Sequence, residues 1–79
     1  LIRNSKVMGD INRIKLVLVE KKKTNKWLAE QLGKDPATVS KWCTNTAQPQ
    51  LETLIAIADI LNVSIEDLLW KNKKVTDNE

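Results

Sequence analysis

The sequence predicts an all-α fold, a compact bundle of five short helices. Apolar residues recur at spacings of three and four between residues 10 and 70, the period of helices that bury one face. No segment alternates apolar and polar residues as a half-buried strand does. Capping and turn residues divide this region into short pieces, and 79 residues allow a single domain. We therefore expect a flexible N-terminal segment (1–9), a helical domain (10–70) and a flexible polar tail (71–79).

The first helix is predicted to begin after Asp10, a favourable N-cap, because Ile11, Ile14 and Leu18 lie at helical spacing. It ends in a run of three lysines, 21–23, whose charges suit the negative end of the helix dipole. No glycine stands at this exit. We therefore expect one of these lysines, Lys22, to adopt the left-handed conformation at a cost of about 1 kcal/mol.

The second helix is predicted from the cap Thr24 to Leu32, with Leu28 and Ala29 on its inward face. Gly33 follows directly, in the place where a helix exit favours a left-handed residue. A short turn is therefore expected between this helix and the next.

The third helix opens with Asp35 as its cap and proline at its first position, and runs to about Thr44. At 100° per residue, Val39 and Trp42 fall on the buried side. Four residues fall on the opposite side and are expected to face solvent: Ala37, Ser40, Lys41 and Thr44.

Two further helices complete the bundle after a loop of turn-forming residues, 45–49. Apolar residues at core spacing predict a fourth helix from Leu51 to near Asn62. Ser64 then caps a fifth helix that reaches Trp70, with Asp67 at the third position of an imperfect capping box.

These segments resemble the phage repressor and Cro-type (Xre-like) helix-turn-helix family over about residues 11–70. The resemblance lies in TNKWLAEQLGKDPATVSKWCTNT (24–46) and in QPQLETLIAIADILNVSIEDLL (48–69). Ala29 fits the small residue needed where the two helices cross, and Gly33 fits the turn glycine. Trp42 fits the shared core, although stacking on a base is an alternative. The resemblance implies a lambda-repressor-like DNA-binding domain whose second and third helices form the helix-turn-helix.

In this family the outer face of the third helix enters the major groove of DNA. Lysine can donate to guanine O6 and N7, hydroxyls can donate or accept, and apolar side chains can touch thymine methyls. The base-contacting candidates are Pro36, Ala37, Ser40, Lys41 and Thr44. The phosphate-contacting candidates are Asn25, Lys26, Lys34, Asn45 and Thr46. Arg13 and Lys15 are further candidates on the first helix.

The charge distribution agrees with a polyanionic partner. The whole chain carries a net charge of +3, but residues 1–45 hold ten Lys/Arg against four Asp/Glu, a net charge of +6. Residues 46–70 hold four acidic residues and no Lys or Arg, a net charge of −4. A basic half joined to an acidic half suggests one side that faces nucleic acid and another that does not.

The leading hypothesis is a sequence-specific regulator that binds double-stranded DNA, a repressor acting as a homodimer on a palindromic operator. The candidates for the dimer contact are Leu68, Leu69 and Trp70. The alternative is a protein-interaction module, such as an antitoxin whose main partner is a toxin.

Other function classes find little support in the composition. There is no histidine, and the single cysteine, Cys43, excludes an internal disulfide and a cysteine-based zinc site. We therefore expect no enzyme activity, no metal and no cofactor. No apolar run approaches the ~20 residues of a membrane span, and a lone thiol fits a reducing cytoplasm.

Overall fold

The computed structural model describes residues 10–70 and confirms the all-α prediction within that range. No strand occurs in this part of the chain, and the predicted flexible segments, 1–9 and 71–79, lie outside it. Its elements are the helices α2 (Ile14–Glu20), α3 (Asn25–Leu32), α4 (Pro36–Cys43) and α5 (Leu51–Leu61), and the 3-10 helix η1 (Ile65–Leu68).

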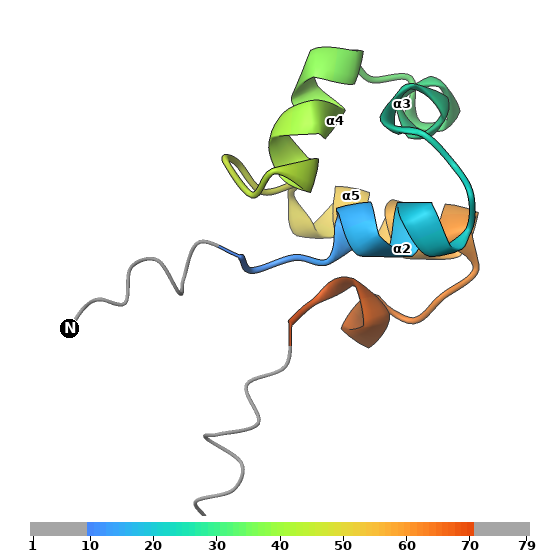
Figure 1. Cartoon of the computed structure of the whole chain (residues 1–79), viewed down its shortest axis with the longest axis vertical. Coiled ribbons are helices and arrows are strands. Elements are labelled where there is room, and N and C mark those ends of the chain that lie inside the picture. The colour runs from blue at the N-terminus through green and yellow to red at the C-terminus, as the bar shows by residue number, and fades with distance from the viewer. Residues whose placement is uncertain (1–9, 71–79) are drawn as a thin grey trace, which may run out of the picture.

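The helices surround one apolar core to which every element contributes. Helices α3 and α4 pack against each other at one end of the molecule, while α2 and α5 lie beneath them (Figure 1). The element η1 packs on α5 and α2 and closes the other end. The core residues are Ile14, Val17, Leu18, Leu28, Ala29, Val39, Trp42, Leu54, Ile57, Ala58, Leu61 and Leu68.

The first helix begins three residues later than the sequence predicted, at Ile14 rather than Ile11. Residues 11–13 instead precede the helix and lie beside the end of the domain, where Trp70 N donates to Ile11 O at 3.0 Å. Asp10 is consequently not the cap. Arg13 occupies the N-cap position without a side-chain hydrogen bond, and Asn12 Oδ1 accepts from Ile14 N, the first amide of the helix, at 2.9 Å. As a result Ile11 is 51% exposed rather than part of the core.

The fifth helix is also shorter than predicted, and it is a 3-10 helix that ends at Leu68. Its capping box is complete, because Ser64 Oγ accepts from Asp67 N and an Asp67 carboxylate oxygen accepts from Ser64 N. Beyond Leu68 the backbone turns extended and Leu69 bridges to Asn12. Leu68 itself is completely buried in the core, so its side chain offers no surface for the predicted dimer contact.

The exit of α2 confirms the expectation for Lys22, which has a φ of +60°. A left-handed conformation costs a residue with a Cβ about 1–2 kcal/mol, and glycine escapes that cost. We expect Lys22→Gly to raise the free energy of unfolding by about 0.5–1 kcal/mol, measured by urea denaturation. The matched control is Lys21→Gly. Lys21 is right-handed (φ −88°), so there glycine is expected to destabilise by a similar amount. Equal effects at both positions would contradict this account.

No helix within residues 10–70 has the length and apolar content that crossing a membrane requires.

Candidate nucleic-acid interface

Helices α3 and α4 form a bihelical unit, and three residues set its geometry: the cap of α3, the glycine at the turn and a small residue between the helices. Thr24 caps α3 by accepting a hydrogen bond from Trp27 N at 3.0 Å. Gly33 ends α3 in the left-handed conformation (φ +68°), as its position predicted. Ala29 is buried on the side of α3 that faces the core, where a small side chain permits close packing with α4. The two helices are therefore held in a defined orientation without any partner molecule.

The outer face of α4 is free of other parts of the described chain. Its inner residues, Val39 and Trp42, are buried in the core, which fixes how the helix is rotated. The five residues predicted to contact bases are all exposed: Pro36, Ala37, Ser40, Lys41 and Thr44. Whether they touch bases remains a prediction, but the helical angles placed four of them, all except Pro36, on the open side.

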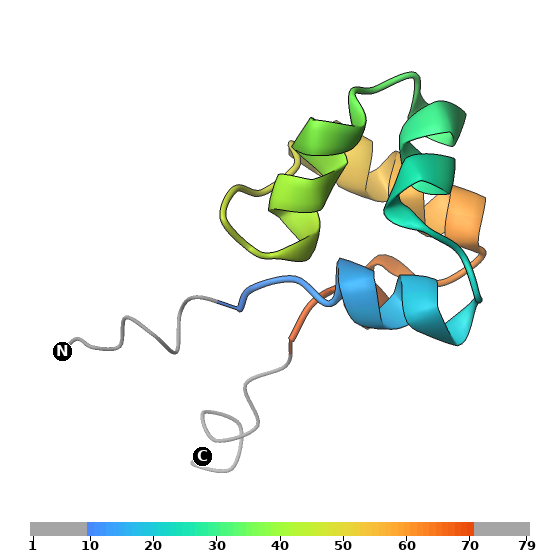
Figure 2. The same cartoon turned by 45° about the horizontal axis from the view of Figure 1, so that its top comes forward.

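The end of α4 leads into a tight loop that projects from the body of the molecule in both views (Figures 1 and 2). The carbonyl oxygen of Lys41 accepts from Thr46 N at 2.9 Å and from Ala47 N at 3.2 Å, which folds the loop back onto the helix. The hydroxyls of Thr44 and Thr46 are 2.7 Å apart and hydrogen bonded. Two exposed hydroxyl groups therefore stand together where α4 ends.

The phosphate-contacting candidates differ in how free their side chains are. Lys26, at the start of α3, and Lys34, in the turn before α4, are both exposed. Asn25 is partly buried, and its Oδ1 accepts from Cys43 Sγ at 3.3 Å. Burial raises the pKa of the Cys43 thiol, with an opposing effect from the charge of Lys15. The thiol thus stays protonated near neutral pH and continues to donate to Asn25.

Asn45 already uses both polar ends of its side chain inside the domain. Its Oδ1 accepts from the backbone amides of Ile11 and Asn12, each at 2.9 Å. Its Nδ2 donates to Asn12 O at 3.1 Å. The residue is left-handed (φ +62°), a conformation that asparagine tolerates well. It therefore ties the loop after α4 to the entry of α2, a role that the sequence analysis did not foresee.

Asn12 is the residue that the sequence analysis missed most clearly. It is the buried polar residue of the described core region, only 3% exposed. Besides accepting from Ile14 N, it donates from Nδ2 to Trp42 O at 2.9 Å and to Gln48 Oε1 at 2.7 Å. The available signal was that an asparagine side chain often accepts from the backbone amide two residues on, here the amide of Ile14.

Two aromatic side chains outside the core carry cations over their rings. Lys23 Nζ lies 4.7 Å from the centroid of the Trp27 ring, and Trp27 packs partly against the core. Arg13 Cζ lies 5.1 Å from the centroid of the Trp70 ring, which is 50% exposed. Trp27 thus covers the α2–α3 connection, whereas Trp70 stands at the open edge of the domain.

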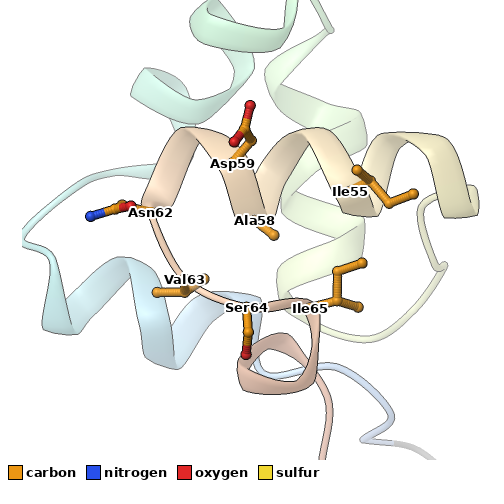
Figure 3. A pocket seen from close by; sticks show the side chains of 7 residues that line it. All are labelled: Ile55, Ala58, Asp59, Asn62, Val63, Ser64 and Ile65. Carbon is orange, nitrogen blue, oxygen red and sulfur yellow. The ribbon is translucent and has the colours of Figure 1, made fainter.

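A shallow hollow on the opposite, acidic half of the molecule lies between α5 and the start of η1. Figure 3 shows Ile55 and Ile65 at one end of it, and Asn62 and Val63 at the other. Asp59 supplies a carboxylate at its edge, and α5 and η1 carry no lysine or arginine. This hollow lacks the positive charge that DNA requires. Within residues 10–70, no three His, Cys, Asp or Glu side chains are grouped as a metal ion would need.

Comparison with known proteins agrees with this geometry. The helix-turn-helix family (HTH_3) matches residues 14–68, which include all the described helices. A search of curated proteins finds no match. Among solved structures, the chain is similar to one described as a "putative DNA-binding protein from Bacteroides fragilis", with a TM-score of 0.75 and 52% sequence identity. That match covers 76% of this chain and 97% of the other. The chain therefore belongs to the helix-turn-helix family, with α3 and α4 as its two defining helices.

Proposed function

We propose that the protein is a sequence-specific transcription regulator that places α4 in the major groove of double-stranded DNA. The observation that carries this proposal is the exposed face of α4, built from small and hydroxyl residues around Lys41. An α-helix fits the major groove of B-form DNA, and this face has no bulky apolar side chain to keep it from the base edges. The similar structure described as a "putative DNA-binding protein from Bacteroides fragilis" lends support.

Each side chain on this face has a role that its chemistry suggests. Lys41 donates to guanine O6 or N7, and the hydroxyls of Ser40 and Thr44 donate or accept at neighbouring base edges. Pro36 and Ala37 contact thymine methyl groups. Because only one cation lies on this face, sequence-dependent DNA shape adds to the discrimination.

Phosphate contacts flank the groove on both sides of α4. Lys34 is exposed just before its beginning, Lys26 is exposed at the start of α3, and Thr46 is exposed just beyond the end of α4. Asn25 stands at the N-terminus of α3, where free backbone amides favour an anion. Asn45 acts on the same edge by holding the loop that carries Thr46. Most of the affinity comes from these contacts, so binding weakens steeply as salt is added.

The proposed regulator is a repressor that binds as a homodimer, and an apolar surface beside Trp70 supports a second copy. A hollow lined almost entirely by apolar groups runs between the entry of the domain and α5; Ile11, Pro49, Leu51 and Leu69 line it. Leu51 is 68% exposed and Ile11 is 51% exposed. Exposed apolar residues that line one surface together mark an interaction site. A twofold axis through this surface would present two α4 helices to half-sites about one helical turn of DNA apart.

A second candidate function is binding to another protein, as an antitoxin binds a toxin. The acidic hollow in Figure 3, with Ile55 and Ile65 exposed or half-buried at its rim, favours this possibility. It lies away from the basic half of the chain, so both functions can operate in one molecule. A pull-down from the native host separates them, since a regulator alone would retain no stoichiometric protein partner.

The proposed function is tested by selection of duplexes from random DNA with the purified protein at two salt concentrations. We expect a consensus with dyad symmetry that persists at the higher salt, while non-specific binding disappears. Enrichment without any consensus, or no enrichment at low salt, would reject the proposal. A consensus without symmetry would retain DNA binding but reject the homodimer.

Replacement of Lys41 distinguishes base reading from general attraction. Lys41→Ala is expected to lower the preference for one base pair of the selected site by about 1–3 kcal/mol, because a lost base contact matters only at its own position. The matched control, Lys34→Ala, removes the same charge from the neighbouring turn and is expected to weaken binding to all duplexes alike. Competition binding against single-base variants of the site gives both values. A uniform loss for Lys41→Ala would assign it to a phosphate instead.

A further inference from the structure

A crevice outside the bihelical unit carries its own set of cations. It lies where residues 11–13 and the first turn of α2 meet the end of α4, and has a volume of about 300 Å³. The residues that matter here are Arg13, Lys15, Thr44 and Trp70, and we call their site the basic crevice. Asp10 is the one acidic residue that lines it.

Arg13 is held in this crevice without a counter-ion. Its backbone amide donates to Leu68 O at 2.7 Å, which fixes the main chain, and its guanidinium lies over the Trp70 ring at 5.1 Å. Its Nε is buried with no hydrogen-bond partner, and no carboxylate within residues 10–70 forms an ion pair with it. A guanidinium stacked on an aromatic face keeps its edge available for a phosphate or carboxylate.

Lys15 and Thr44 face the same space. Lys15 is exposed on the first turn of α2, and its charge acts on the Cys43 thiol, which also lines the crevice. Thr44 belongs to the outer face of α4, so the crevice continues the surface proposed to enter the groove. Two cations and a hydroxyl thus converge beside the end of that helix, a combination that suits a singly charged phosphodiester.

We propose that the basic crevice binds a backbone phosphate of DNA next to the groove occupied by α4, with Arg13 and Lys15 as its donors. Trp70 is the positioning residue that keeps the Arg13 guanidinium in place. This inference rests on the proposed function, and it extends the DNA contact beyond α3 and α4 to both ends of the domain.

The test measures how the association constant depends on salt, using a duplex with a single half-site so that dimer formation does not contribute. Log K falls as log salt rises, and each lost phosphate contact reduces the steepness of this slope by about 0.9. We expect Arg13→Gln and Lys15→Ala each to lower it by up to about 0.9, and the double variant by no more, because they share one phosphate. Lys21→Ala removes the same charge from the other end of α2 and is expected to leave the slope unchanged.

The role of Trp70 has a separate readout. Trp70→Leu is expected to lower the slope as Arg13→Gln does, whereas Trp70→Phe retains an aromatic face and the full slope. In the Arg13→Gln background, Trp70→Leu is expected to have no further effect. An effect of Trp70→Leu that is independent of Arg13 would overturn the positioning role.

The outcomes separate this inference from the function on which it rests. If the wild-type protein shows no affinity for duplex at low salt, both fail. If it binds, and the crevice variants keep the wild-type slope or fall together with Lys21→Ala, only the crevice is rejected. Ethylation of single phosphates identifies the contact directly. In Lys15→Ala, ethylation of one phosphate beside the site must no longer interfere with binding. An interference pattern identical to that of the wild type would reject the crevice. If inorganic phosphate binds to the crevice but the crevice variants leave DNA binding unchanged, the proposal is rejected as well.

Discussion

Asn12→Ala is expected to lower the free energy of unfolding by about 1.5–4.5 kcal/mol. The change leaves the buried amide of Ile14 without a partner and removes one of the two hydrogen bonds to the carbonyl of Trp42, which still accepts from Asn45 N. An unpaired buried group costs about 1–3 kcal/mol, and a lost hydrogen bond about 0.5–1.5 kcal/mol. For a domain of this size the loss is a large fraction of the total stability. Urea denaturation followed by tryptophan fluorescence measures it.

Gln48→Ala is the matched control for this network. Gln48 is exposed and supplies only one of the hydrogen bonds of Asn12, so its removal is expected to cost less than about 1.5 kcal/mol. Similar losses for the two variants would show that the buried bonds of Asn12 contribute little. If Asn12→Ala is already partly unfolded without urea, the result agrees with the prediction and gives a lower limit for the loss in the free energy of unfolding.

Trp42→Ala is expected to lower the free energy of unfolding by about 3–5 kcal/mol. The side chain is only 5% exposed and anchors α4 in the core, and alanine leaves a cavity that the helical backbone cannot close. DNA binding should fall in proportion to the fraction of unfolded protein, since Trp42 points away from the proposed DNA face. Trp42→Leu fills part of the space and is expected to keep binding at temperatures where it remains folded.

The same pair of variants tests the alternative that Trp42 stacks on a base. If Trp42→Ala unfolds no more readily than the wild type but loses DNA binding, the residue contacts DNA. Thermal unfolding followed by circular dichroism, together with binding at a temperature well below the midpoint, separates stability from recognition.

Local signals in the sequence predicted the helix ends and helix rotations that depend on residues close together in the chain. Thr24 and Gly33 mark the two ends of α3 as predicted, because caps and left-handed exits involve residues only a few positions apart. The angular reading of α4 worked for the same reason, since burial of Val39 and Trp42 sets the rotation of the whole helix.

The errors occurred where distant segments compete with local preference. Ile11 continues the helical spacing, yet residues 11–13 lie outside the helix because their backbone groups pair with residues 68–70 and with Asn45. The same pairing ends η1 at Leu68, a candidate for the dimer contact, which is buried in the core. Hydrogen bonds between residues more than thirty positions apart leave no periodic pattern. The sequence therefore offered Arg13 and Lys15 as phosphate candidates but did not show that they meet Thr44 and Trp70 in one crevice.

The pairing of residues 11–13 with 68–70 has a consequence for how the protein is made. Because Leu68 fills the core and its carbonyl holds the amide of Arg13, the first helix lacks part of its support until the last turn has left the ribosome. Translation that stops before this point yields a chain with an open core. The domain therefore reaches its final form only after synthesis of this region is complete, and a truncated product offers proteases an unfinished fold.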